Sequence, residues 1–245
     1  VIEEFMEGEE ASVLCFTDGN TIVPMISAQD HKRISDGDRG ANTGGMGAYA
    51  PAPVMTKELD KIVYDTILLP AVKAMKKEGC PFKGCLYAGL MITKDGPKVV
   101  EFNCRFGDPE TEAVLPLLES DLAKIMLACT KGTLKKEKVE WKNACAVDVV
   151  LASEGYPATH SSEEEISGLK EAKKTGCLVF HAGSMKKNGR YFVNGGRVLN
   201  VAAVAPTLKE ARDKAYEGVS KISWRGMQYR HDIADKGLKR LKKRK

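Results

Sequence analysis

The sequence predicts an α+β protein in which an antiparallel sheet with flanking helices precedes a small β-rich region with one packed helix. Apolar residues recur at helical spacing over 56–79, and a β-hairpin pattern follows over 85–103. From 143 onward the pattern changes to short strands separated by turns. This order of elements, without an internal repeat, indicates two successive domains.

We expect these domains to occupy 1–142 and 143–235, followed by a basic tail over 236–245. The tail reads KGLKRLKKRK and carries much of the net charge of +5, so the rest of the chain is nearly neutral. Such a run can contact RNA or an acidic membrane, but at a domain end it is more often a solvated terminus. We assign it no function. The chain opens on VIEEF, which we interpret as a start inside a domain.

The first predicted helix begins after Thr56, a suitable N-cap, and carries Glu58 and Asp60 in its first turn. It ends near Gly79, and Pro70 is expected to kink it. Its apolar stripe consists of Leu59, Ile62, Val63, Ile67, Ala71 and Met75. The hairpin that follows pairs strands over 85–93 and 98–103.

Two shorter helices are predicted over 110–118 and 122–131, the second ending at Gly132. Beyond 142, strands are predicted over 145–152, 177–183, 191–193 and 198–204. A capping box, Thr207 with Glu210, begins the last predicted helix. The buried stripe of that helix is Leu208, Ala211, Ala215, Val219 and Ile222.

The composition favours a soluble, cytoplasmic protein. Hydrophobic residues make up 43% of the 245, yet no apolar run approaches the roughly 18 residues of a membrane span. The seven cysteines are scattered and contain no CxxC pair, which argues against disulfides and zinc sites and favours reduced core thiols. They are Cys15, Cys80, Cys85, Cys104, Cys129, Cys145 and Cys177.

A candidate metal site lies in the second hairpin strand, at Glu101 and Asn103. Residues at i and i+2 of a strand face the same side, so a carboxylate and an amide oxygen converge there. Both are hard oxygen ligands suited to Mg²⁺, which takes few protein ligands beside phosphates and water. By itself the pattern is more often an exposed polar strand face.

The loop after this strand contains Arg105 and Asp108. A guanidinium offers a planar fork for phosphate or acyl phosphate oxygens, and a carboxylate can accept from sugar hydroxyls or an amine. The alternative is an Arg–Asp surface ion pair worth about 1 kcal/mol or less.

A third cluster joins the basic stretch Asp30, His31, Lys32 and Arg33 to a glycine-rich turn, 42–47. Glycines let the backbone approach a ligand closely, and exposed amides can hold a phosphate or carboxylate. The alternative is an ordinary turn, with His31 as a surface histidine whose proton affinity nearby cations lower. Carboxylates at Glu3, Glu4 and Glu10 are a weaker signal, because acidic residues around a glycine are common on surfaces.

Several longer motifs resemble the glycinamide ribonucleotide synthetase family of the ATP-grasp superfamily. They are VIEEFMEGEEASVLCFTDG, AQDHKR, NTGGMGAYAPAP, LYAGLM, EFNCRFGDPET, GYP, FHAG, GGRVL and MQYRHDI, in the family's order and covering the chain up to Ile233. The resemblance implies an ATP-grasp domain, truncated at its N-terminus, followed by a small β-rich domain. An isolated chain of this kind is expected to turn over poorly.

The same resemblance implies an ATP-dependent ligase that joins glycine to 5-phosphoribosylamine through glycyl phosphate, with Mg²⁺ or Mn²⁺. It assigns the metal to Glu101 and Asn103, phosphoryl stabilisation to Arg105, and adenine and ribose binding to Glu3, Glu4 and Glu10. Asp108 is assigned a catalytic role in placing substrate. The substrate-binding residues that it implies are Asp30, His31, Lys32, Arg33, Asn42, Thr43, Gly44, Gly45 and Gly47.

The chain departs from the family pattern at Ile26–Ser27, where Pro-Pro is usual, and at Glu112, where Gln is usual. Fusion to other purine-pathway enzymes is left open. Two other functions also remain as alternatives: a different ATP-grasp carboxylate–amine ligase, and a noncatalytic fragment whose basic tail recruits nucleic acid. The second lacks the interleaved aromatic residues that stack bases, so we expect no nucleic-acid partner.

Overall fold

The computed structural model describes residues 2–243, which form two compact units. Unit 1 contains the residues up to Gln29 together with 51–107 and 118–142. Unit 2 contains 30–50, 108–117 and the chain from Asn143 onward. Each unit is therefore assembled from three separate stretches, whereas the predicted domains are continuous.

Unit 1 is built on a four-stranded antiparallel sheet with the order β2-β1-β7-β8. Its strands are β1 (Glu9–Thr17), β2 (Ile22–Pro24), β7 (Gly84–Thr93) and β8 (Gly96–Asn103). Strands β7 and β8 confirm the predicted hairpin. Their register shifts between Gly89 and Leu90, which pair with Glu101 and Val99, so the register skips Val100 as a β-bulge does.

The predicted helix after Thr56 is present and contains a π-turn, but Ile62 and Met75 of its predicted apolar stripe are exposed. It consists of α1 (Lys57–Val63), the π-turn η1 (Tyr64–Leu68) and α2 (Leu69–Lys77). Thr56 accepts the Leu59 N–H at 3.2 Å and thereby caps the first turn. Pro70 lies in the first turn of α2, directly after the π-turn, where its missing N–H is tolerated.

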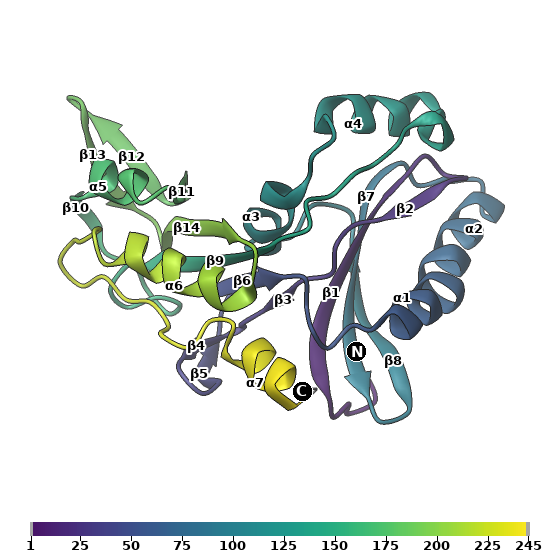
Figure 1. Ribbon diagram of the computed structural model, residues 1–245, viewed down its shortest axis with the longest axis horizontal. Helices are drawn as coiled ribbons and strands as arrows, with labels where there is room; N and C mark the ends of the chain where they lie inside the picture. The colour runs from purple at the N-terminus through teal and green to yellow at the C-terminus, as the bar shows by residue number, and fades with distance from the viewer. Residues whose placement is uncertain (1, 244–245) are drawn as a thin grey trace. The chain divides into compact units, whose positions relative to one another are not determined.

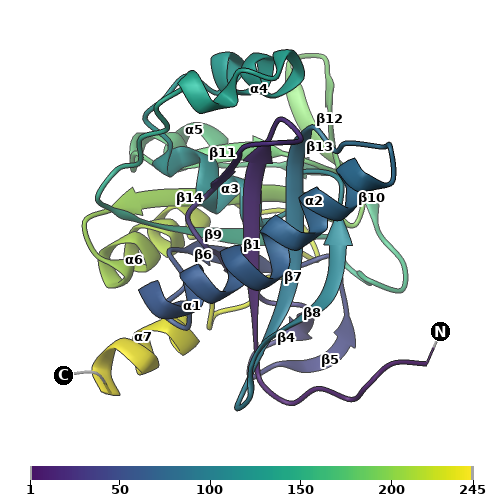
Figure 2. The same ribbon diagram turned by 90° about the vertical axis from the view of Figure 1, so that its right-hand side faces the viewer.

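These helices cover one face of the unit 1 sheet (Figure 2). Their buried side chains Val63, Ile67, Leu68 and Val72 pack against alternate strand residues. The strand residues in this cluster are Ala11, Val13, Cys15, Ile22, Leu86, Ala88 and Leu90. Since successive strand residues alternate between faces, Glu10, Ser12, Tyr87 and Gly89 belong to the opposite face.

Unit 1 also contains a second helical region. Helix α4 (Leu122–Lys131) begins at Asp121, whose carboxylate accepts the Lys124 N–H, and ends at Gly132 with φ +72°, as predicted. A 3₁₀ turn, η3 (Leu134–Lys136), follows.

Unit 2 contains a five-stranded sheet with the order β11-β14-β9-β6-β3, a three-stranded sheet β10-β13-β12 and the hairpin β4-β5. The strands of the large sheet are β3 (Gln29–Asp30), β6 (Gly47–Ala50), β9 (Cys145–Ala152), β11 (Leu178–His181) and β14 (Arg197–Ala205). The other strands are β4 (Arg33–Ser35), β5 (Arg39–Asn42), β10 (Ser162–Ile166), β12 (Ser184–Lys187) and β13 (Arg190–Asn194).

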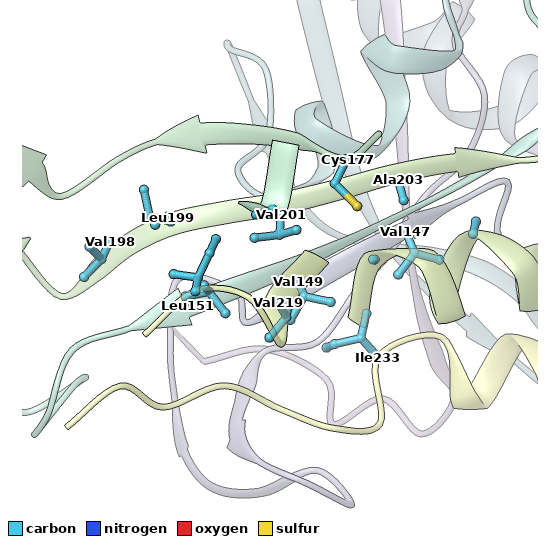
Figure 3. Packing of buried hydrophobic residues seen from close by; sticks show 14 of the residues in the cluster. Val147, Val149, Leu151, Cys177, Val198, Leu199, Val201, Ala203, Val219 and Ile233 are labelled. Carbon is cyan, nitrogen blue, oxygen red and sulfur yellow. The ribbon is translucent and has the colours of Figure 1, made fainter. Parts of the chain in front are cut away.

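Helices flank the large sheet of unit 2 (Figure 1). Helix α6 (Leu208–Val219) packs on β9 and β14, and its Thr207–Glu210 capping box and buried stripe are as predicted. Figure 3 shows this core, in which Val147, Val149 and Val201 of the sheet pack together with Val219. The remaining elements are α3 (Glu110–Val114), the 3₁₀ turn η2 (Leu115–Leu117), α5 (Leu169–Lys174) and α7 (Asp235–Lys243).

Helix α7 takes up most of the predicted basic tail, whose last two residues lie outside the described range. None of the helices between residues 2 and 243 is long and apolar enough to cross a bilayer. All seven cysteines are free thiols, but the prediction that all are core residues is wrong. Cys80 and Cys104 are exposed, because each lies in the connection that follows a helix or strand.

Candidate functional site

In unit 1 the predicted metal pair lies on the sheet face opposite helices α1 and α2. Ser12 pairs with Gly89, which in turn pairs with Glu101, so these three residues form one row across the sheet. Tyr87 likewise pairs with Asn103 in the next row of the same face. Glu10 lies on this face as well, opposite Met91. Glu10 of β1 therefore shares one face with Glu101 and Asn103 of β8, although the two strands are distant in sequence.

Glu101 and Asn103 contact each other directly. The Asn103 Nδ2 donates to the Glu101 Oε1 at 2.8 Å. Gly89, the cross-strand partner of Glu101, leaves space for this side chain, since a Cβ at Gly89 would lie 3.3 Å from the Glu101 Cγ. This hydrogen bond leaves the Asn103 Oδ1 and the Glu101 Oε2 as the remaining acceptors.

This donor set fits an ion whose other ligands come from a nucleotide. Among residues 2–243, no three His, Cys, Asp or Glu side chains gather into a cage that could hold a metal. A carboxylate and an amide oxygen are nevertheless the hard donors that Mg²⁺ takes, usually one or two from protein. The pair therefore suits a phosphate-bound ion.

The other predicted residues of unit 1 are exposed, as Glu101 is. Arg105 follows β8 and donates from Nη1 to the Phe106 carbonyl at 3.0 Å. Glu4 pairs with Lys98 at 2.7 Å and borders a hollow of about 390 Å³ beside the tip of the β7–β8 hairpin. Glu3 is exposed in the same N-terminal segment.

In unit 2 the glycine-rich turn is fixed to the segment that contains His31. The His31 N–H donates to the Gly47 carbonyl at 3.0 Å, and the Met46 N–H donates to the His31 carbonyl at 2.9 Å. Thr43 donates from both its N–H and its hydroxyl to the Lys32 carbonyl, each at 2.8 Å. These bonds bring the two halves of the third predicted cluster together.

The interpretation of His31 as a surface histidine is wrong. Its side chain lies in the interior and is only 1% exposed, because its backbone bonds hold it against β6. Burial, followed by the charges of Arg230 and Lys236, lowers the pKa of His31 to about 3. The expected lowering of the His31 pKa is confirmed. Burial is its main cause, and the cations that contribute are Arg230 and Lys236 rather than the sequence neighbours Lys32 and Arg33. The ring is neutral at physiological pH.

The remaining members of this cluster differ in exposure. Asp30 is buried and forms an ion pair with Lys32 at 2.7 Å. Arg33 and Asn42 face each other across the exposed β4–β5 hairpin. The Gly45 N–H donates to the Thr43 hydroxyl at 3.0 Å, inside the turn.

Asp108 has a cationic partner in unit 2, Arg197. The Nη1 of Arg197 lies 2.8 Å from the Asp108 Oδ1 and 3.0 Å from the Asp108 carbonyl oxygen. The same nitrogen lies 3.0 Å from the Gly44 carbonyl oxygen. Arg197 was not predicted as a site residue, although it belongs to the GGRVL motif.

Two carboxyl groups of unit 2, the buried Asp148 and the half-buried Glu112, were also missed. Asp148 interrupts the apolar strand β9, accepts from the Asn200 Nδ2 at 2.9 Å, and leaves its Oδ1 without a hydrogen bond. Burial and the neighbouring Glu112 raise its pKa well above the ordinary value. Burial, and next the charge of Asp108, raise the pKa of Glu112 to about 7. An aspartate inside a buried strand is the sequence signal that points to this pair.

Comparison with known families gives two matches in the expected order. Residues 1–111 match the ATP-grasp (A) domain of phosphoribosylglycinamide synthetase. Residues 146–236 match the C domain of the same family. The chain belongs to the phosphoribosylglycinamide synthetase family. The fold is accordingly that of an ATP-grasp domain joined to the family's C domain.

Relatives in this family are about half identical to the chain over the aligned residues. The trifunctional purine biosynthetic protein adenosine-3 of Gallus gallus is 53% identical over 239 residues, which are 97% of this chain and 24% of that protein. The chloroplastic phosphoribosylamine–glycine ligase of Arabidopsis thaliana is 50% identical over 244 residues, 98% of this chain and 46% of the relative. The chain thus spans a quarter to a half of these family members.

A solved structure of the same family has a similar fold. The crystal structure of phosphoribosylamine–glycine ligase from Thermotoga maritima superposes with a TM-score of 0.82 at 38% sequence identity. The match covers 94% of this chain and 56% of that one.

Proposed function

We propose that the protein containing this chain joins glycine to 5-phosphoribosylamine with ATP, releasing ADP and phosphate through glycyl phosphate. The family supports this proposal, and so do the ligase names of relatives from a plant and a bacterium. The observation that carries it is the placement of Glu101, Asn103 and Glu10 on one sheet face of the ATP-grasp domain.

The unit 1 residues suit the nucleotide half of the reaction. We assign Glu101 and Asn103 to a Mg²⁺ or Mn²⁺ ion, which would neutralise charge on the phosphate oxygens when bound. Arg105, with an exposed guanidinium, binds an anionic phosphoryl oxygen. Glu10 accepts hydrogen bonds from the ribose hydroxyls, and Glu3 and Glu4 belong to the segment that receives the adenine. No covalent enzyme nucleophile is needed.

The unit 2 residues suit the acceptor half. The carboxylate of Asp108 attracts a substrate amine, and the amides of the 42–47 turn bind substrate oxygens. Asp30, His31, Lys32 and Arg33 belong to the segment that is hydrogen-bonded to this turn. His31 is neutral, so it serves as a hydrogen-bonding group rather than as a cation.

Phosphate release by the whole gene product that contains this chain tests the proposal. Release should require ATP, Mg²⁺, glycine and phosphoribosylamine together, and should fall by about 100-fold or more in Glu101→Ala. Glu78→Ala, an exposed carboxylate at the C-terminal end of α2 in the same unit, is the matched control and should retain activity.

Two results would overturn parts of the proposal. A folded protein without substrate-dependent phosphate release lacks the activity, whereas full activity of Glu101→Ala removes Glu101 from the metal site. Release that persists when another amine replaces phosphoribosylamine would favour a different ATP-grasp carboxylate–amine ligase. Replacing Mg²⁺ by Mn²⁺ in the same assay determines which ion supports the reaction better.

Two further assignments rest on relatives and composition. The trifunctional relative of Gallus gallus supports fusion of the whole protein to other purine enzymes. We place the protein in the cytoplasm, in keeping with its seven free cysteines, although one relative is named as chloroplastic. Fractionation of cells with an antibody to this chain tests the location, and the size of the detected band tests the fusion.

A further inference from the structure

We propose that Arg197 is the positioning residue of the acceptor-side site, because it holds the glycine-rich turn 42–47 and Asp108 in a single geometry. The inference rests on the proposed function for its kinetic consequences. Its structural part, the fixing of the turn, stands independently of any activity.

The guanidinium of Arg197 joins two segments that are far apart in the sequence. Its Nη1 lies 3.0 Å from the Gly44 carbonyl oxygen and 3.4 Å from that of Gly45. The same atom lies 3.0 Å from the Asp108 carbonyl oxygen and 2.8 Å from its Oδ1. Four oxygens thus surround one nitrogen, and three of them are backbone carbonyls.

The turn is shaped to accept this guanidinium. A Cβ at Gly44 would lie 3.1 Å from the Arg197 Cζ and 3.2–3.3 Å from its Nη2 and Nε, so the planar group lies against the bare Cα. At Gly45, with φ +115°, a Cβ would overlap the Pro109 ring and lie 3.3 Å from the Asp30 Oδ2. A side chain at Gly45 would displace the turn from Pro109, and one at Gly44 would require the Arg197 guanidinium to shift.

The backbone at the base of Arg197 is itself held firmly. The Arg197 carbonyl accepts the Gly183 N–H at 2.8 Å, and the Gly196 carbonyl accepts the Ser153 N–H at 2.8 Å. Tyr156 supplies a second link, because its hydroxyl accepts the Gly44 N–H at 2.9 Å while its ring lies against Gly196. The Arg197 guanidinium and the Tyr156 hydroxyl therefore bind the turn, and the backbone around Arg197 is itself held by hydrogen bonds.

This geometry differs from that of a surface ion pair. An exposed pair can separate without moving the backbone, whereas Arg197 is 21% exposed and mainly contacts carbonyl oxygens. Its removal would free the two glycines to adopt other backbone conformations and leave Asp108 without its cation. A substrate held by the turn would then lose its fixed orientation.

Steady-state kinetics of the whole gene product test the functional part. Arg197→Met should raise the KM for glycine or phosphoribosylamine, and lower kcat/KM by about 100-fold, with the KM for ATP unchanged. Arg197→Lys keeps the charge but not the planar contact with Gly44, so it should recover part of the loss. Arg190→Met is the matched control and should behave as wild type, because Arg190 is an exposed arginine paired with Glu165.

Hydrogen exchange of the Gly44 and Gly45 amides tests the structural part without any substrate. Both amides should exchange at least about tenfold faster in Arg197→Met and Arg197→Lys than in wild type, with unchanged exchange in α6. Unchanged protection of these amides in either folded variant overturns the inference. Equal rises in every KM would also overturn it, because a general structural defect has that effect.

The two proposals fail in distinguishable ways. Absence of ligase activity in wild type, with faster exchange at Gly44 in the variants, rejects the proposed function and keeps the role of Arg197 in the turn. Normal ligase activity in Arg197→Met with unchanged exchange rejects the role of Arg197 alone.

Discussion

Arg230 and Asp232 form a two-pronged ion pair in unit 2, with Nε to Oδ1 and Nη2 to Oδ2 both at 2.7 Å. The Arg230 side chain is 0% exposed. Its Nη1 also donates to the Asp38 Oδ1 and to the Arg33 carbonyl, each at 3.0 Å. The Arg-His-Asp sequence near the end of the chain thereby fixes the β4–β5 hairpin, which directly precedes the glycine-rich turn.

Replacing Arg230 by Met should destabilise the protein by roughly 2–4 kcal/mol, because two carboxylates lose their buried cation. Urea unfolding at pH 7 measures the change. Arg225→Met is the control: Arg225 is 85% exposed and lies 3.5 Å from Glu164, so its loss should cost less than about 0.5 kcal/mol. Equal effects of the two variants would show that the Arg230 cluster is not a stabilising link.

Glu112 should make stability depend on pH near neutrality. Its pKa is raised from 4.5 to about 7, so the folded state favours the protonated form, and the stability this provides is lost as pH rises from 4.5 through about 7. Glu112→Gln should therefore stabilise the protein by about 1–2 kcal/mol at pH 8 and leave it nearly unchanged at pH 4.5. Thermal unfolding at both pH values measures this, and a gain of equal size at both would contradict it.

Asp18 should have the opposite dependence on pH. Burial acts to raise its pKa, but hydrogen bonds from the backbone of Thr21, Asn20 and Leu134 lower it overall below the ordinary 3.8. The stability that the carboxylate provides is therefore present above this value and is lost as pH falls through the folded-state pKa.

The Asp18→Asn variant tests this dependence. It should cost about 1–2 kcal/mol at pH 7, because hydrogen bonds to a charged acceptor are replaced by weaker ones. The difference from wild type should shrink at pH 3. Asp121→Asn, an exposed helix cap in the same unit, is the control and should lose less. A penalty that stays constant with pH would exclude the charge of Asp18 as the cause.

Gly45→Ala should destabilise the 42–47 turn through a steric overlap with Pro109 as well as through its φ of +115°. Gly189→Ala provides the matched control, because Gly189 has φ +79° and a Cβ added there would meet no atom within 4 Å. The control should lose about 1 kcal/mol, and Gly45→Ala at least about 1 kcal/mol more. Equal losses in chemical unfolding would mean that the turn has room for a side chain.

Much of the local structure was predictable from residue patterns. The β7–β8 hairpin, the Thr56 cap, the α4 end at Gly132 and the Thr207 capping box each depend on residues adjacent in sequence. Such features follow from backbone preferences and short-range hydrogen bonds, which a sequence pattern displays directly. The exposure of His31 was mispredicted for the opposite reason, since its burial depends on Gly47 and Tyr49 of β6, which are distant in sequence.

The sequence by itself determined the family, most of the elements after Thr56 and the placement of Glu101 beside Asn103, because each is encoded in contiguous motifs or in the two-residue period of a strand. The strands before Thr56, together with β10, α5 and β12, were not predicted. Only the tertiary structure decided that 30–50 and 108–117 join the unit of the C-terminal residues, and that Asp108 meets Arg197. It also decided that the half-buried Glu112 lies near the buried Asp148. These contacts join residues that are tens of positions apart in the sequence. They depend on packing, burial and charge in the folded chain, which a local sequence pattern does not contain.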